Sequence, residues 1–149
     1  IWPDIKPVSL KEIIIINGPN LNLLGQREPL LYGSESFEEY FKKLKKEFPN
    51  TKLSYEQLNE EGQLVEAIHR AGEKADGIVL NPAAYTHTSI ALSDAVAAID
   101  IPVVEVHISK VEAREPYRQK SYVSKYAIGR ISGFGLDGYH MAVGQLLRS

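Results

Sequence analysis

The sequence contains no cysteine. This absence excludes disulfide bonds, thiolate catalysis and cysteine-ligated metal sites. It is also compatible with a reducing compartment, and we expect a cytoplasmic protein. No apolar run approaches the roughly 20 residues that a membrane-spanning helix needs. The net charge of −2 and the pI near 6.1 offer no general attraction for nucleic acid or an anionic membrane. We therefore expect neither as a partner.

Residues 1–11 lack both an initiator methionine and the pattern of a signal peptide. We interpret this segment as an N-terminal extension or a remnant of cloning. The chain of 149 residues has the length of one domain, and its 44% hydrophobic content is ordinary for a globular protein. No repeat, low-complexity tract or linker divides it, so we predict a single domain over residues 1–149.

In the remaining sequence, strand patterns alternate with helix patterns, except that a polar loop follows the fourth strand. Strands are expected at residues 12–16, 52–57, 77–80, 102–107 and 127–132, and the helices between and after them at about 37–48, 61–74, 89–99 and 136–147. Such alternation favours a parallel sheet with helices on both faces. We predict an α/β fold, a flavodoxin-like three-layer sandwich with strand order 2-1-3-4-5. A Rossmann fold is the alternative, but no Gly-x-Gly-x-x-Gly follows the first strand.

One connection, residues 17–33, is far longer than the others. Its seventeen residues join the first strand to the first helix, where about 2–6 residues are enough. A loop of this length in a small domain is either functional or disordered. The run of four isoleucines before it and its own apolar content argue against disorder. We therefore expect the polar residues Asn20, Arg27 and Tyr32 of this loop to have a function.

Polar residues also follow the third and fourth expected strands. Ligands of open α/β sheets bind beyond the carboxyl ends of the strands, near the change in strand order. In the predicted order, strands one, three and four are neighbours, so their polar residues converge on one pocket. These residues are Asn81 and His87 after strand three, and Glu105, His107, Ser109, Arg114 and Arg118 at the end of strand four and beyond.

Most of these side chains also have a structural explanation. In that explanation, Asn20 and Asn22 would stabilise turns through side-chain bonds to backbone, Tyr32 would pack as an aromatic ring, Arg27 would be a solvated surface residue, and His87 would cap a helix or bond to backbone. His69 and His140, in helices, are expected to be structural or exposed. Glu105 differs, because it lies between two valines, where an unpaired carboxylate is costly. Strand geometry places it on the same side as His107, and a carboxylate beside a histidine is a recurring acid–base arrangement.

Several motifs, in this order, resemble the signature of the type II 3-dehydroquinate dehydratases, also called type II dehydroquinases. They are the sequences NGPNLNLLG at 17–25, REP at 27–29, YG at 32–33, NPAAYTHTS at 81–89, EVHIS at 105–109, then Arg114-Glu115, Arg118 and the turn at 133–139. The resemblance covers the chain from about residue 12 to its end. Several long motifs in the correct order are far more specific than one short pattern.

The resemblance implies that the protein removes water from 3-dehydroquinate to give 3-dehydroshikimate, in the shikimate pathway or in quinate breakdown, with no cofactor and no metal. It implies that Tyr32 is the base and acts as a tyrosinate that Arg27 favours. It further implies that Asn20 stabilises the enolate through a bound water. His107 would then be the general acid for the departing hydroxyl, with Glu105 holding its ring.

The resemblance also assigns the substrate contacts. Asn81, His87 and Arg118 match residues that bind substrate hydroxyls, and Ile108 with Ser109 matches the carboxylate anchor. Asp94 matches an aspartate that reaches into a neighbouring subunit's site. The implied homo-oligomer is a dodecamer built from trimers.

Two positions differ from the family pattern. Lys110 stands where an asparagine is common, and Pro116, which fixes φ and removes a donor, stands where a glutamate is frequent. We therefore expect residues 110–118 to differ locally. Because Tyr32 and Arg27 both lie in the loop of residues 17–33, we expect that loop to close over the site as a lid.

Other functions remain as alternatives. The unrelated Schiff-base mechanism needs a buried lysine, no lysine lies within an apolar strand, and Lys110 is the nearest candidate. A flavin-binding module would need a phosphate-binding loop of Ser, Thr and Gly after strand one, which Pro19 and the leucines of the loop suit poorly. A phospho-receiver would need acidic residues where Asn17 and Asn81 stand. An inactive structural relative is a further alternative.

Overall fold

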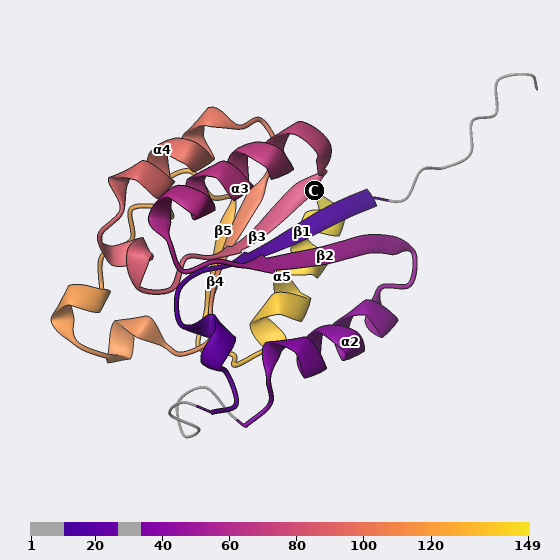
Figure 1. Ribbon diagram of the computed structural model, residues 1–149, viewed down its shortest axis with the longest axis horizontal. Coiled ribbons are helices and arrows are strands. Elements are labelled where there is room, and N and C mark those ends of the chain that lie inside the picture. The colour runs from indigo at the N-terminus through magenta and orange to yellow at the C-terminus, as the bar shows by residue number, and fades with distance from the viewer. Residues whose placement is uncertain (1–10, 27–33) are drawn as a thin grey trace, which may run out of the picture.

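The computed structural model describes residues 11–26 and 34–149. Its centre is a five-stranded parallel sheet of β1 (Lys11–Asn17), β2 (Thr51–Gln57), β3 (Gly77–Asn81), β4 (Val103–His107) and β5 (Gly129–Ser132) (Figure 1). The strand order is β2-β1-β3-β4-β5, with every neighbouring pair parallel. This confirms the predicted fold and strand order, and the Rossmann alternative is wrong.

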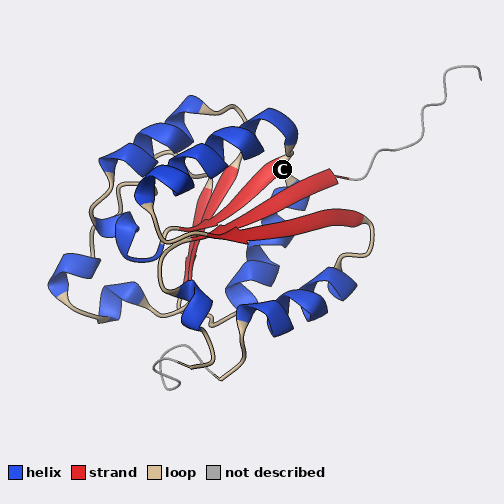
Figure 2. Cartoon of the chain, in the orientation of Figure 1, coloured by secondary structure: helices blue, strands red, loops and turns tan. Residues whose placement is uncertain are grey.

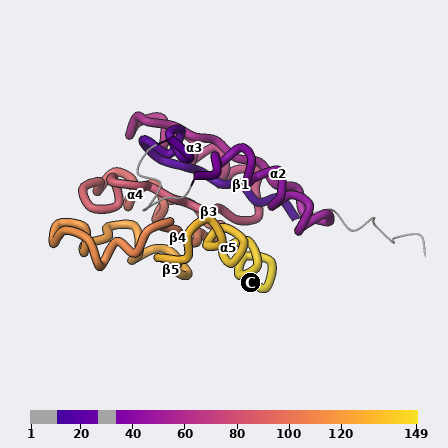
Figure 3. Tube along the Cα trace, turned by 90° about the horizontal axis from the view of Figure 1, so that it is seen from below, coloured from indigo at the N-terminus to yellow at the C-terminus, as the bar shows by residue number. Residues whose placement is uncertain are grey.

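Two helices cover each face of the sheet (Figure 2). They are α2 (Phe37–Glu47) and α5 (Asp137–Arg148) on one face, and α3 (Glu61–Lys74) and α4 (Ile90–Ala98) on the other. Short 3-10 helices lie in the connections: η1 (Leu21–Leu23), η2 (Ala83–His87), η3 (Val111–Ala113) and η4 (Pro116–Arg118). In Figure 3, the segments from the first half of the chain, β1, α2 and α3, lie toward one edge of the sheet. The later segments β4, β5 and α5 lie toward the other edge.

The isoleucine run explains why β1 lies inside the sheet, between β2 and β3. Ile13 and Ile15 pack into the layer of α2 and α5, whereas Ile14 and Ile16 pack into the layer of α3 and α4. All four are at most 4% exposed, as the alternation of side chains along a strand requires when both faces are covered. The run therefore anchors the sheet and fixes where the loop after Asn17 begins.

The helix and strand boundaries follow the sequence closely, with small differences. Ser36 caps α2, since its hydroxyl accepts a hydrogen bond from the Glu39 N–H at 3.1 Å, as the predicted capping box requires. The last strand is shorter than expected and begins at Gly129. Lys11, assigned above to the N-terminal extension, is the first residue of β1 and pairs with Thr51. Residues 1–10 lie outside the described part of the chain.

The described residues include no helix that is both long and apolar enough to cross a membrane. The cytoplasmic location stays a prediction.

Candidate active site

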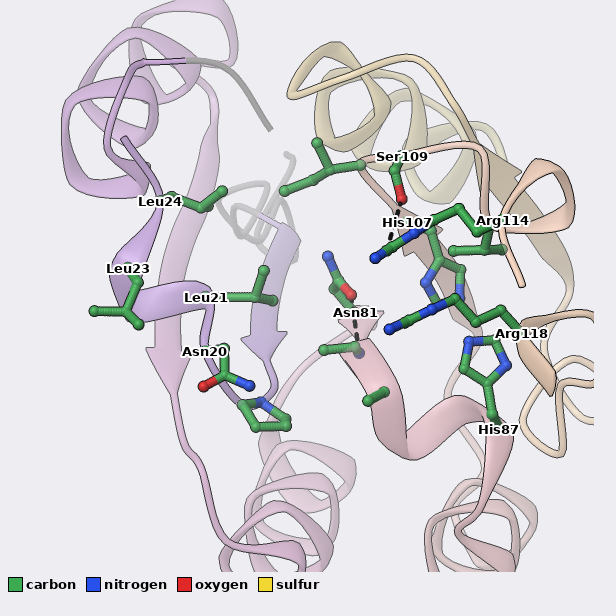
Figure 4. A pocket seen from close by; sticks show the side chains of 15 residues that line it. Asn20, Leu21, Leu23, Leu24, Asn81, His87, His107, Ser109, Arg114 and Arg118 are labelled. Carbon is green, nitrogen blue, oxygen red and sulfur yellow. Dashed lines mark hydrogen bonds between the residues drawn. The ribbon is translucent and has the colours of Figure 1, made fainter. Parts of the chain in front are cut away.

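A pocket of about 140 Å³ lies beyond the carboxyl ends of β1, β3 and β4 (Figure 4). This is the edge of the sheet where the change in strand order places ligand sites. The described residues that line it are Pro19, Asn20, Leu21, Leu23, Leu24, Asn81, Ala83, Ala84, His87, His107, Ile108, Ser109, Val111, Arg114 and Arg118. Leucines of η1 lie on one side, and imidazoles and guanidiniums lie on the other.

The pocket brings together most of the residues predicted from the sequence. Asn20, Asn81, His87, His107, Ile108, Ser109 and Arg118 all line it. Glu105 lies behind His107, and Asp94 is exposed on α4 and is not a lining residue. Arg27 and Tyr32 fall in residues 27–33, outside the described part of the chain, and so does the segment on which the predicted lid depends.

Glu105 and His107 form the buried pair that the strand pattern predicts. Glu105 is 0% exposed and His107 is 3% exposed, and His107 Nε2 lies 2.5 Å from Glu105 Oε2. A buried carboxylate needs further partners. Three hydroxyl groups provide them: Thr86 at 2.9 Å, Ser121 at 3.0 Å and Ser124 at 2.6 Å.

These contacts fix the protonation of the pair. Burial by itself would raise the pKa of the Glu105 carboxyl, but hydrogen bonds from His107 and Ser124 and the nearby Arg130 lower it to about 2. Glu105 is therefore ionised at neutral pH and accepts a hydrogen bond from His107 Nε2, which carries a proton. That leaves Nδ1 as the ring nitrogen of His107 that exchanges a proton with a ligand.

His87 has the opposite arrangement. Its Nδ1 lies 2.7 Å from the Lys120 carbonyl, which can only accept, so Nδ1 carries a proton. Burial and the nearby positive groups of His107 and Arg118 lower the pKa of His87, and the bond to Lys120 only partly opposes them. The neutral ring therefore presents a bare Nε2, which can accept a hydrogen bond from a hydroxyl. Of the two structural explanations for His87, the bond to backbone is the one observed, and Ser89 caps α4 instead.

Asn81 is held by a residue that the sequence analysis missed. Its Oδ1 accepts from the Ala83 N–H at 3.0 Å, and its Nδ2 donates to the Tyr139 hydroxyl at 2.8 Å. Tyr139 in turn donates to Asn17 Oδ1 at 2.8 Å. The bond to Ala83 helps to hold that residue at φ 53°, an unfavourable conformation for a residue with a side chain. Asn81 therefore presents its amide to the pocket in one fixed orientation.

Asn20 lies in a turn, but its side chain makes no hydrogen bond that caps η1, so the structural explanation through a side-chain bond is not supported. Its φ is 70°, its N–H donates to Asn59 Oδ1 at 3.1 Å, and its carbonyl accepts from Leu23 N–H at 3.0 Å. Its side chain nevertheless lies at the pocket (Figure 4). Gly18 brings this turn against β3, because a Cβ there would lie 2.7 Å from the Pro82 carbonyl oxygen.

Two arginines make the far side of the pocket positive. Arg114 donates to the Ser109 hydroxyl at 3.5 Å, and Arg118 donates to Glu115 at 2.6 Å. Pro116 is accommodated at the start of η4, where a missing N–H costs nothing. Arg118 therefore reaches the pocket despite the departure at that position. Lys110 is exposed and does not line the pocket, so nothing supports it as a Schiff-base lysine.

The arrangement suits a small anionic molecule that carries hydroxyl groups. Guanidiniums and the Ser109 hydroxyl attract a carboxylate, the His87 and Asn81 side chains complement hydroxyls, and His107 exchanges a proton. The described residues contain no cluster of His, Cys, Asp and Glu that would hold a metal ion.

Comparisons with known proteins agree with this chemistry. Residues 11–147 match the family model described as dehydroquinase class II. A 3-dehydroquinate dehydratase of Aliivibrio salmonicida is 52% identical over 133 residues, 88% of this chain and 89% of that protein. One from Clostridium botulinum is 48% identical over 142 residues, 94% of this chain and 97% of that protein. The crystal structure of a type II dehydroquinase from Butyrivibrio crossotus superposes with a TM-score of 0.90 at 42% identity, and the match covers 93% of this chain and 99% of that one.

Proposed function

The chain belongs to the class II dehydroquinase family, and we propose that it dehydrates 3-dehydroquinate to 3-dehydroshikimate through an enolate. As a member of that family it is a hydro-lyase. The observation that carries the detailed proposal is the buried Glu105–His107 pair, which faces a pocket with two arginines. The pair supplies a proton donor, and the arginines suit the substrate's carboxylate.

The first step is removal of the proton next to the ketone. We assign it to Tyr32, as a tyrosinate, on the resemblance of its motif. A free tyrosine has a pKa near 10, so its anion needs a nearby cation, and Arg27 is assigned that role. The electron pair left by the proton forms an enolate. Asn20, which lies at the pocket, would stabilise the enolate oxygen through a water molecule.

The second step expels the hydroxyl group. The enolate electrons return to form the ketone, the carbon–carbon double bond forms, and the carbon–oxygen bond of the hydroxyl breaks. His107 gives that oxygen its Nδ1 proton, so the leaving group is water. Glu105 remains ionised and keeps the ring oriented through Nε2.

The remaining lining residues bind the substrate. We propose that the substrate carboxylate binds to the backbone N–H of Ile108 and to the hydroxyl of Ser109, which Arg114 contacts. Asn81, His87 and Arg118 then bind hydroxyl groups. Support comes from the fixed amide of Asn81 and from the bare Nε2 of His87, because each offers the polarity that a hydroxyl group requires.

We further propose a dodecamer of trimers, in which Asp94 of one copy reaches the site of its neighbour. The exposed position of Asp94 on α4 leaves it accessible to another copy. Sedimentation of the purified protein gives the size directly, and a monomer that turns over at full rate would contradict the role of Asp94.

The test is to add 3-dehydroquinate and follow the ultraviolet absorbance of the conjugated enone. We expect steady product formation by the wild type, and no inactivation when borohydride is added together with substrate. No absorbance at micromolar enzyme would overturn the proposed reaction. Covalent trapping by borohydride would instead show a Schiff-base mechanism.

A further inference from the structure

Behind the Glu105–His107 pair lies a charged residue that neither lines the pocket nor belongs to the sites assigned above. Arg130 of β5 is paired in register with Glu105 of β4. Its Nε lies 3.4 Å from Glu105 Oε2, the oxygen that also accepts the hydrogen bond from His107 Nε2. Its Nη1 lies 3.2 Å from Glu112 Oε1, on η3. His107, Glu105, Arg130 and Glu112 therefore form a row of alternating charge when His107 is protonated.

The hydrogen bonding of Arg130 is incomplete, which argues against a purely structural role. Within the described part of the chain, its buried Nε and Nη2 atoms have no hydrogen-bond partner. The contact from Nε to Glu105 is thus an ion pair without a hydrogen bond. Buried donors without partners cost free energy, and an apolar side chain in place of a buried ion pair is often neutral or stabilising. The useful property of Arg130 is therefore its charge.

That charge matters most when the proton moves. Before the transfer, the Glu105 carboxylate is compensated by both the imidazolium and Arg130. Afterwards the imidazole is neutral, and Arg130 is the remaining cation within 4 Å of the Glu105 carboxylate among the described residues. A cation at this place stabilises the state after transfer relative to the state before it. Glu112 holds the guanidinium from its outer side.

We propose that Arg130 is a positioning residue for the dehydration, which acts through Glu105 to make His107 a stronger proton donor to the leaving hydroxyl. The inference rests on the proposed function and extends it to a residue outside the pocket. Other titratable or charged groups face the pair as well, and among them only Glu112 is changed in a variant below. They are His87 from η2, Glu112 from η3, Arg118 from η4 and Arg114 between η3 and η4.

The test is the pH profile of kcat in Arg130→Met. Without the Arg130 cation, protonated His107 gives up its proton less readily. We therefore expect the alkaline limb of the pH profile of kcat to move up by about one pH unit. We also expect kcat to fall about threefold to tenfold, less than the loss of a whole general acid. KM should stay within about twofold, and the acidic limb should stay in place. Arg70→Met removes an arginine whose pair with Glu56 is exposed, and it should match the wild type.

Three further variants keep the inference testable if Arg130→Met does not fold. Arg130→Lys retains a cation and should hold the alkaline limb near its wild-type position, whereas Arg130→Gln should show the upward shift. Glu112→Gln removes the second anion that pairs with the Arg130 guanidinium, so more of its charge acts on Glu105. The alkaline limb of this variant should therefore move down in pH. Equal profiles for Lys and Gln at position 130, or an alkaline limb that does not move in Arg130→Met, would overturn the inference.

A His107→Ala sample separates this inference from the proposed function. If the wild type fails to dehydrate 3-dehydroquinate, or if His107→Ala turns over normally, the proposed function fails. If both behave as proposed and the Arg130 variants keep wild-type profiles, only the role of Arg130 fails. A fall in melting temperature with kcat and the limb unchanged would show a structural role and contradict the inference.

Discussion

At the scale of single residues, the site depends on an ionised Glu105 and on which ring nitrogen of each histidine carries a proton. Glu105 is surrounded by Thr86, Ser121 and Ser124, whose hydroxyls donate to it, so the carboxylate stays ionised and His107 Nε2 stays protonated. His87 is held neutral by burial and nearby cations. Two histidines in one pocket thus have different roles, because the group that each one contacts is different.

Tyr32 is the residue whose replacement tests the first step. Tyr32→Phe removes only the phenolic oxygen, so we expect kcat to fall by about 10²-fold or more with substrate affinity largely kept. Steady-state assays with direct binding measurements separate the two effects. Tyr126→Phe is the matched control, because that ring is exposed and does not line the pocket. Near-normal turnover by Tyr32→Phe would rule out its assignment as the base.

Single-residue patterns predicted part of this site and missed part of it. The spacing of two within an apolar strand was enough to pair Glu105 with His107. The contacts of Glu105 with Ser124 and Arg130 depend on how distant segments pack and on the register between β4 and β5. Sequence spacing carries no such information, so these partners were not predicted.

At the scale of elements, α5 supports the pocket from behind. Its Tyr139 is fully buried and bridges Asn17 at the end of β1 to Asn81 at the end of β3. The two strands that flank the change in strand order are thus tied through one hydroxyl group. The turn before α5 was noticed in the sequence, but nothing local to it indicates that Tyr139 contacts asparagines so far away.

Tyr139→Phe tests this tie. Loss of the hydroxyl leaves the side-chain amides of Asn17 and Asn81 without a shared partner, so we expect the free energy of unfolding to fall by about 1–3 kcal/mol. Because Asn81 then loses its fixed orientation, KM should rise more than kcat falls. Urea unfolding and steady-state kinetics measure the two effects.

Tyr40→Phe serves as the control, since this ring packs beside Tyr139 in the same core. If the two variants had the same kinetics, the hydroxyl of Tyr139 would have no part in orienting Asn81.

The elements themselves were largely predictable. The isoleucine run, the capping box of α2 and the helical spacing of α3 are local signals, and each lies where it was expected. The 3-10 helices η3 and η4 were not predicted, because short turns of this kind depend on contacts of the loop with the pocket wall. The strand order followed from the alternation of elements and the handedness of crossovers.

At the scale of the whole molecule, the buried carboxylate links stability to pH. The pKa of Glu105 is about 2 in the folded protein and about 4.3 in an unfolded chain. Its stabilising contribution is therefore complete above pH 4.3 and is lost as the pH falls toward 2. The full contribution is about 3 kcal/mol.

The free energy of unfolding of Glu105→Gln should therefore depend less on pH in the acidic range. Between pH 6 and pH 3 we expect its free energy of unfolding to fall by about 2 kcal/mol less than that of the wild type. Urea titrations at steps of pH provide the comparison. Glu56→Gln, at an exposed position, should keep the wild-type slope, and parallel curves for Glu105→Gln would contradict the stated ionisation of Glu105.

The proposed dehydration of 3-dehydroquinate requires His107 as the proton donor to the leaving hydroxyl. The most direct measurement is turnover of that substrate by His107→Ala, followed by enone absorbance beside the wild type. We predict that kcat falls by about 10²- to 10⁴-fold while substrate binding stays within about threefold. Turnover by His107→Ala close to the wild-type rate would contradict the account.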